Sequence, residues 1–208
     1  KGSGLLTKPT VITEKKGYAG SVKAKYKFMQ DLKEKYYKKL VPEMMKKFGY
    51  KTPMAVPRIL KVVVNTGTGK IRDNKDAVVL VEKHLGLITA QKPSPRPAKK
   101  AISSFKTRKG QIIGFKVTLH GKRMYDFIDK LINLSIPRMR DFRGISLNSI
   151  DENGNLTLGI KEHIVFPETM GEDIKTIFGL EITIVTNSKT KPEAVTLFKL
   201  LGFPLKNV

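Results

Sequence analysis

The chain has 208 residues with 40 Lys or Arg and 18 Asp or Glu, which gives a formal net charge of +22. This charge indicates a polyanionic partner, and the 40% hydrophobic content allows a buried core in one domain with an appendage or in two small domains. The lack of cysteine excludes disulfides, thiolate catalysis and zinc–thiolate sites. No apolar run approaches the ~20 residues of a membrane span, and residues 1–20 lack the apolar core of a signal peptide.

Residues 1–22 are rich in Gly, Ser, Thr and Lys and show neither a strand period nor a helix period. They predict a basic, extended arm without a core of its own. Two interpretations stay open, an unstructured tail and an arm that orders on RNA. The domain proper is expected to occupy residues 23–208.

The domain is expected to begin with a helix over 23–48, because Phe28, Leu32, Tyr36 and Leu40 recur every four residues. Pro42 suits the first turn of a second helical segment, and Gly49 is a plausible end. Tyr36 is assigned to the core rather than to stacking on RNA.

A β-branched run over 59–65 predicts a strand, which leads into Asn65-Thr66-Gly67-Thr68-Gly69-Lys70. Its spacing rules out a Walker loop, because Val64 stands where Gly is required and Ile71 follows Lys70. The glycines still allow a ligand to approach the backbone closely. A helix capped by Asp73 or Asn74 is expected over 75–85, with Gly86 closing it and a short strand over 87–90.

The central run 91–123 holds ten cations and no Asp or Glu. Beside a polyanion each cation can displace a condensed counterion. Phe105, Phe115 and a predicted strand over 111–120 lie within the run and are unlike a solvated tail, so the run predicts nucleic-acid binding. Its cations are Lys92, Arg96, Lys99, Lys100, Lys106, Arg108, Lys109, Lys116, Lys122 and Arg123.

Residues 124–208 carry 10 basic and 11 acidic residues, which predicts a neutral scaffold. An amphipathic helix is expected over 122–134, and Asn153-Gly154 between 146–150 and 156–160 predicts a hairpin. A strand over 181–187 precedes a last helix, for which Thr190 and Glu193 form a predicted capping box. The alternating order predicts an α+β fold, an antiparallel ferredoxin- or RRM-like sheet with helices packed on one face and a long basic loop.

An arginine-rich turn follows the helix over 122–134, with Arg138, Arg140 and Arg143 around Asp141. It is either a surface turn with an Arg–Asp pair or a clamp on an RNA backbone, because arginine binds phosphate in a bidentate manner. An enzyme is not expected. His84, His120 and His163 are not spaced as metal ligands, and no HExxH motif occurs.

The chain from residue 32 to 204 resembles the bacterial-type large-ribosomal-subunit protein five family, which binds 5S ribosomal RNA. The match departs at Thr66, where the family usually has Met, and it does not include residues 1–25. The motifs that carry it, in the family's order, are Val56-Pro57-Arg58, Val62-Val63-Val64-Asn65-Thr66-Gly67-Thr68-Gly69, Gln91-Lys92-Pro93, Ser104-Phe105-Lys106, Arg108-Lys109-Gly110, Gly114-Phe115-Lys116-Val117-Thr118-Leu119, Ile136-Pro137-Arg138, Arg140-Asp141-Phe142-Arg143-Gly144, Gly159-Ile160-Lys161-Glu162 and Phe166-Pro167-Glu168.

The resemblance implies a structural, non-enzymatic role in the central protuberance of the large subunit, without cofactors, metals or membrane contact. It implies contacts with 5S rRNA, 23S-type rRNA, P-site tRNA, neighbouring large-subunit proteins and a small-subunit head protein. The implied 5S rRNA-binding residues are Asn65, Thr66, Gly67, Thr68, Gly69, Lys70, Gln91, Lys92, Lys99, Lys100, Thr118 and His120. The implied tRNA-contacting loop has Phe105, Lys106, Arg108 and Lys109, and Arg138, Arg140 and Arg143 are assigned to other rRNA or to the intersubunit bridge.

The implied location is a cytoplasmic ribosome, and the sequence leaves an organellar ribosome open. The alternative is a free-standing RNA-binding regulator or chaperone on a similar sheet. Cosedimentation with large ribosomal subunits at high salt separates the two.

The electrostatic contribution of residues 91–123 to RNA binding can be tested by the salt dependence of the affinity. Replacing Lys99 and Lys100 by Ala should lower the slope of log affinity for 5S rRNA against log salt by roughly 0.7 to 0.9 for each phosphate that the variant no longer neutralises. Affinity measured across a salt series reads this slope directly. An unchanged slope would show that the two lysines face solvent in the complex.

Overall fold

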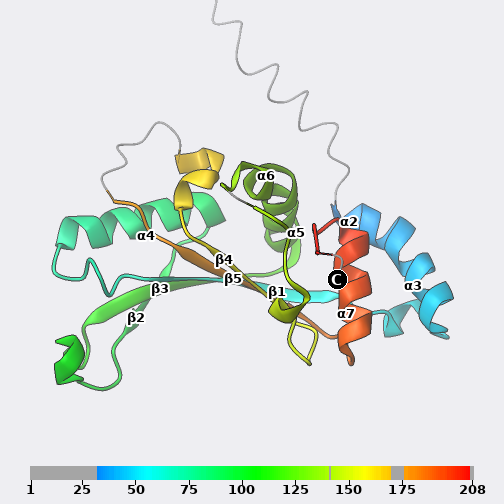
Figure 1. Cartoon of the computed structure of the whole chain (residues 1–208), viewed down its shortest axis with the longest axis horizontal. Helices are drawn as coiled ribbons and strands as arrows, with labels where there is room; N and C mark the ends of the chain where they lie inside the picture. Colours follow the sequence, from blue (N-terminus) through cyan, green and yellow to red (C-terminus); the bar gives the residue numbers. More distant parts are fainter. Residues whose placement is uncertain (1–31, 141, 170–175, 207–208) are drawn as a thin grey trace, which may run out of the picture. The chain divides into compact units, whose positions relative to one another are not determined.

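The computed structural model describes residues 32–140, 142–169 and 176–206 (Figure 1). The predicted arm over 1–22 and the predicted domain start at residue 23 lie outside these ranges, and so does Asp141 of the predicted Arg–Asp pair. Among the described residues, every helix is too short or too polar to cross a membrane.

A five-stranded antiparallel sheet forms the centre of the domain, with the strand order β2-β3-β1-β5-β4. In the chain the helix α4 separates β1 from β2, and α5 separates β3 from β4, so the predicted α+β fold class is confirmed. The strands are β1 (Ile59–Gly67), β2 (Ser94–Pro97), β3 (Ile112–Leu119), β4 (Leu156–Ile160) and β5 (Leu180–Thr186).

Helices line one side of this sheet, and α4 and α5 lie above it in Figure 1. The longer helices are α3 (Val41–Phe48), α4 (Lys75–Thr89), α5 (Gly121–Lys130) and α7 (Lys191–Leu201). Shorter helical pieces are α2 (Leu32–Lys35), α6 (Ile136–Arg138), the π-turns η1 (Tyr36–Leu40) and η4 (Leu131–Ser135), and the 3₁₀ turns η2 (Pro53–Ala55), η3 (Ser103–Phe105), η5 (Leu147–Ser149), η6 (His163–Val165) and η7 (Pro167–Thr169).

The strands alternate between a buried and an exposed set of side chains, as a period of two requires. On β1, Val62 and Val64 are fully buried under the helices, and on β3 so are Phe115, Val117 and Leu119. The residues between them point to the opposite side and are exposed or half-buried. We call this second side the open face.

Two helix ends follow the sequence expectations. Asn74 rather than Asp73 caps α4, because its side chain accepts a hydrogen bond from the Ala77 N–H at 3.1 Å. Gly49 ends α3 in the left-handed region at φ 69°, and its N–H donates to the Met45 carbonyl at 2.9 Å.

The predicted strand over 87–90 is wrong, because α4 continues through Gly86 to Thr89. The reason is burial. Val81, Leu85 and Ile88 are all in the core, at the spacing of one helix face. Keeping that face intact outweighs the ~1 kcal/mol by which an internal Gly disfavours a helix.

The hairpin and the capping box also differ from expectation. Leu147–Ser149 is a 3₁₀ turn, and only Ile150 bridges to Leu156, so β4 finds its partner in β5. At α7 the Thr190 side chain makes no capping bond. The carboxylate of Glu193 instead accepts from the Lys189 N–H at 3.1 Å, which lies one residue too early for the box.

The predicted helix over 23–48 is observed from Leu32 onward, and it contains the π-turn η1. The one over 122–134 begins at Gly121 and passes into the π-turn η4 after Lys130. The core assignment of Tyr36 is confirmed, because the ring is 3% exposed and the hydroxyl donates to the Pro57 carbonyl at 2.9 Å. Burial raises the pKa of Tyr36 to about 12, so the hydroxyl keeps its proton for this bond.

Two histidines that are 79 residues apart in sequence meet on the helical side of the sheet. His84 Nδ1 of α4 lies 3.3 Å from His163 Nε2 of η6, and the His163 ring stacks on Phe178 with 4.0 Å between centroids. Both imidazoles are buried. Burial, and after it the neighbouring His84, lowers the pKa of His163 from 6.5 to about 4.

This pair predicts acid sensitivity of the fold. Between pH 6.5 and about 4 the unfolded chain binds a proton at His163 while the folded protein does not, so the free energy of unfolding falls as the pH drops through this window. At ~1.4 kcal/mol per pH unit the loss reaches at most about 3 kcal/mol. Denaturant unfolding from pH 7 to pH 4 should therefore show a flatter pH dependence in His163→Gln. The matched control is His120→Gln, which removes an exposed histidine; equal slopes in the two variants would contradict the argument.

Candidate RNA interface

The open face presents two rows of mostly polar or small residues across four strands, fixed by the antiparallel register. One row joins Lys116, Asn65, Glu181 and Gly159, and the next joins Thr118, Val63, Thr183 and Thr157. Ser94 and Arg96 of the edge strand β2 extend the surface beyond Lys116. Such a surface offers hydrogen-bond donors and acceptors with few large side chains in the way.

The glycines of this region fall into two kinds. A Cβ added at Gly114 would meet the Thr66 carbonyl oxygen at 2.6 Å, so the strand pairing itself requires that glycine. A Cβ at Gly67, Gly69 or Gly159 would meet nothing within 4 Å, and none of the three has a positive φ. Because the fold does not require these three glycines, they leave room for the close approach of another molecule.

The connection between β2 and β3 folds back on itself as a hairpin extension, residues 98–111, which we call the finger. Ala98 N–H donates to the Gln111 carbonyl at 2.8 Å, and Ile102 and Thr107 exchange two backbone bonds of 3.1 Å. At the tip the 3₁₀ turn η3 ends at Lys106 in the left-handed region, φ 50°. The ring of Phe105 is 66% exposed there.

A groove of about 1350 Å³ lies between the finger, the loop 67–72 and residues 177–179. We call it the finger groove. Among the described residues that line it, six are cations and none is acidic: Lys70, Arg72, Lys99, Lys100, Lys106 and Lys161. Its remaining walls include the exposed apolar side chains of Ile102, Phe105 and Ile177.

Ten of the twelve predicted 5S rRNA-binding residues separate into two groups. Asn65, Gln91, Lys92, Thr118 and His120 lie on or beside the open face; Asn65 donates to Glu181 at 3.4 Å, and Gln91 donates to the Thr118 carbonyl at 3.3 Å. His120 is exposed and its Nδ1 lies 3.3 Å from the Leu60 carbonyl oxygen. The other group lines the finger groove, namely Gly67, Gly69, Lys70, Lys99 and Lys100.

Two residues of the predicted set point inward. Thr66 is 2% exposed and its hydroxyl donates to the Gly179 carbonyl at 2.8 Å. Thr68 is fully buried, and its N–H donates to the Ile113 carbonyl at 2.9 Å. Neither side chain is accessible to a ligand in this structure, because residues 64, 66 and 68 continue the buried alternation of β1.

The predicted tRNA-contacting residues lie together on the finger, and all four are exposed. Phe105 and Lys106 line the finger groove, whereas Arg108 and Lys109 do not. The finger therefore carries cations on two sides.

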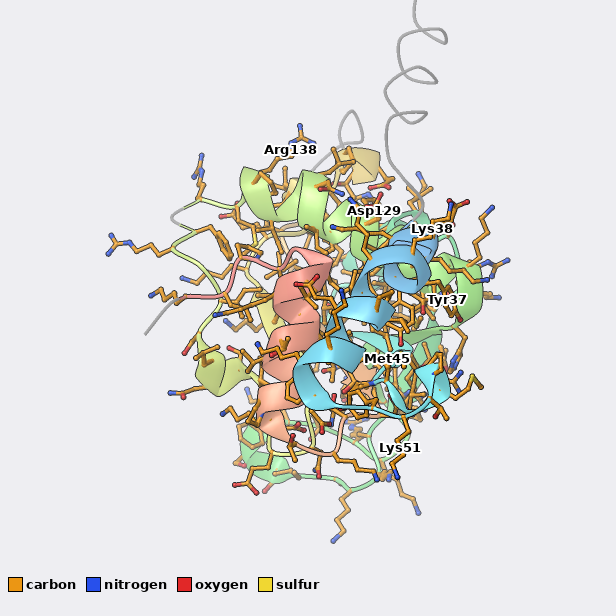
Figure 2. The ribbon with its side chains drawn as sticks, turned by 90° about the vertical axis from the view of Figure 1, so that its right-hand side faces the viewer. Tyr37, Lys38, Met45, Lys51, Asp129 and Arg138 are labelled. Atoms are coloured by element: carbon orange, nitrogen blue, oxygen red, sulfur yellow. The ribbon has the colours of Figure 1, made fainter. Side chains whose placement is uncertain are left out.

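Two of the three predicted arginines lie near the other edge of the sheet. Arg140 and Arg143 line a second groove of about 680 Å³ beside β4, and Arg138 lies on α6. Figure 2 looks onto the side of the molecule where α3 and α7 lie next to each other. In this view Arg138 points outward at the top, and Lys51 points outward at the opposite end. No arrangement for metal binding accompanies these sites: within the described ranges, no three His, Asp or Glu side chains gather.

Sequence reasoning missed Arg72, Lys161 and Ile177 in the finger groove, and Arg96 and Lys116 as members of the open face. Apolar residues at every second position of 113–119 place Lys116 on the opposite side of the strand. The position of Lys116 on the open face could therefore have been predicted from the sequence. Ile177 gave no signal, because a single apolar residue in a loop does not reveal that it is exposed.

Comparisons with known proteins agree with the resemblance. Residues 52–108 match the family "Ribosomal protein L5", and residues 112–205 match "ribosomal L5P family C-terminus". The "Large ribosomal subunit protein uL5" of Dictyoglomus turgidum is 54% identical over 178 residues, 86% of this chain and 99% of the relative. The protein of that name from Fervidobacterium nodosum is 50% identical over 181 residues, 87% of this chain and 98% of the relative. The chain therefore belongs to the uL5 family of large-ribosomal-subunit proteins, whose part in the ribosome is structural rather than enzymatic.

Proposed function

We propose that this protein binds 5S rRNA through its open face and thereby helps to build the central protuberance of the large ribosomal subunit. Family membership supports the ribosomal role over a free-standing regulator. The observation that carries the RNA contact is the set of glycines without a structural role, Gly67, Gly69 and Gly159, beside polar rows of small side chains. RNA helices are recognised mostly by shape and by contacts to phosphates and 2′-hydroxyls, for which such a surface is suited.

The charges of the open face suggest how the RNA lies on it. Lys116 and Arg96 lie toward the β2–β3 edge and the exposed Lys92 precedes β2 by two residues, whereas the carboxylate of Glu181 lies on β5 and accepts from Asn65. Phosphates are favoured at the basic edge and disfavoured near Glu181. The sugar edges and exposed base edges, which include hydrogen-bond donors, are then expected above β1 and β5.

The finger and the arginines complete the proposal. Arg108 and Lys109 on the exposed side of the finger contact P-site tRNA, and Arg138, Arg140 and Arg143 contact other rRNA or the small-subunit head protein. These assignments rest on the resemblance and on exposure, since Arg108, Lys109, Arg140 and Arg143 are accessible to a partner.

Glycine substitutions test 5S rRNA binding. Gly67→Val should leave the melting temperature nearly unchanged, because its side chain enters open space, but should weaken 5S rRNA binding by blocking close approach. Gly114→Val is the contrast, since its Cβ would clash with the Thr66 carbonyl and should destabilise the fold. Gel-shift titration and thermal unfolding measure the two effects. A Gly67→Val protein that melts early yet binds RNA normally would overturn the assignment.

The division of roles on the finger has its own test. The double variant Arg108→Ala, Lys109→Ala should weaken P-site tRNA binding to reconstituted ribosomes, while the affinity of the free protein for 5S rRNA stays within about twofold, because neither residue lines the groove or belongs to a strand of the sheet. Filter binding of tRNA and titration of 5S rRNA supply the two readouts. Loss of 5S rRNA affinity with normal tRNA binding would reverse the assignment.

A further inference from the structure

The finger groove is lined by residues that the family resemblance assigned to two different RNAs. Gly67, Gly69, Lys70, Lys99 and Lys100 belong to the predicted 5S rRNA set, and Phe105 and Lys106 belong to the predicted tRNA set. They line one cavity of about 1350 Å³, which is larger than the ~300–1000 Å³ usual for a small-molecule site. A single ligand of extended shape fits this arrangement better than two separate contacts.

The charge of the groove selects a polyanion. Six Lys or Arg side chains line the groove, and the described part of its lining includes no acidic residue. Arg72 reaches the exposed carboxylate of Asp73 only at 3.8 Å, which is too long for a strong ion pair. Cations gathered in this way repel one another, and a phosphate backbone relieves that repulsion and releases counterions.

The apolar side chains of the groove favour unpaired over paired nucleic acid as the ligand. Phe105 is 66% exposed, Ile177 58% and Ile102 46%, so three large apolar side chains face solvent around the groove. A duplex offers such side chains phosphates, sugars and base edges but no base face, because its base faces are stacked. An unpaired nucleotide offers the face of its base, and bases stack well on exposed aromatic rings.

We propose that the finger groove binds a short unpaired segment of the same RNA that lies on the open face, with a base packed between Phe105 and Ile177 and its phosphates on Lys99 and Lys100. The assignment to 5S rRNA rests on the proposed function. It is supported by continuity, since Gly67 ends a strand of the open face and also lines the groove. Ile177 and Phe105 are thereby assigned to base recognition, and the lysines to phosphate binding.

The test uses the full chain and a short single-stranded oligoribonucleotide labelled for fluorescence anisotropy, with a duplex of the same length as the comparison. Because the open face is itself proposed to bind paired RNA, the test compares the loss that each variant causes in single-strand binding with the loss it causes in duplex binding, which should stay within about twofold. Phe105→Ala should weaken single-strand binding roughly five- to a hundredfold, as is typical for loss of base stacking. Ile177→Ala should weaken it less, since Ile has no ring.

Matched controls separate the groove from general surface effects. Tyr37→Ala removes an aromatic ring that is 57% exposed on η1, and Val79→Ala removes an aliphatic side chain that is 63% exposed on α4. Neither residue lines the groove, so both controls should bind the single strand like the unaltered protein. Unchanged single-strand binding in both Phe105→Ala and Ile177→Ala, or an equal loss of duplex and single-strand binding in these variants, would overturn the proposal.

A competition experiment identifies the RNA that supplies the segment. Saturating 5S rRNA should displace the oligonucleotide, because both need the same groove. If the oligonucleotide stays bound to the protein–5S rRNA complex, the groove serves another RNA and the assigned source is wrong. If 5S rRNA does not bind at all, the proposed function fails, whereas the single-strand measurement still decides the chemistry of the groove.

Discussion

The burial of one face of the sheet beneath α4 and α5 is the constraint on which the rest of the structure depends. Val62, Val64, Phe115, Val117 and Leu119 are removed from water there, and each such side chain contributes roughly 1.5 to 3 kcal/mol on full burial. A strand that commits alternate residues to this core must send the others to the opposite side. The open face is thus a by-product of the core, and evolution could fill it with residues chosen for contact with a partner.

The same constraint explains how the covering helices are attached. Lys130 at the end of α5 donates to the Ile88 carbonyl of α4 and to the Glu168 carboxylate of η7, each at 2.6 Å. One side chain therefore satisfies an acceptor near the end of α4 and ties two helices to the segment that carries His163. The proposed RNA contact would give the opposite side of the sheet its covering from another molecule.

Local patterns predicted the elements well and the long-range pairings less well. The β-branched run over 59–65 and the apolar run over 111–120 identified strands correctly, and the four-residue spacing around Tyr36 identified a helix. The continuation of α4 over 87–89 was missed because Gly86 reads locally as a helix end, whereas the burial of Ile88 is a property of the whole fold. The pairing of β4 with β5 rather than with residues 146–150 likewise depends on contacts distant in sequence.

The candidate site, too, could be predicted from the sequence only in part. Composition and the acid-free run predicted a polyanion-binding region, and the resemblance supplied residues for it. That Thr66 and Thr68 face the core could not be predicted, since it depends on which side of β1 the helices cover. The contact between His84 and His163 could not be predicted from the sequence either, and the same holds for the position of Ile177 beside the finger. Each brings together segments that are far apart in the chain.

The prolines of β2 have a consequence for the protein before it meets its RNA. This edge strand pairs with β3 on one side only, and Pro95 and Pro97 lack the N–H that a further strand would need. Arg96 between them adds a charge at the same edge. At this edge a newly made copy therefore resists extension of its sheet by a second copy, which keeps the finger beside β2 free for its RNA partner.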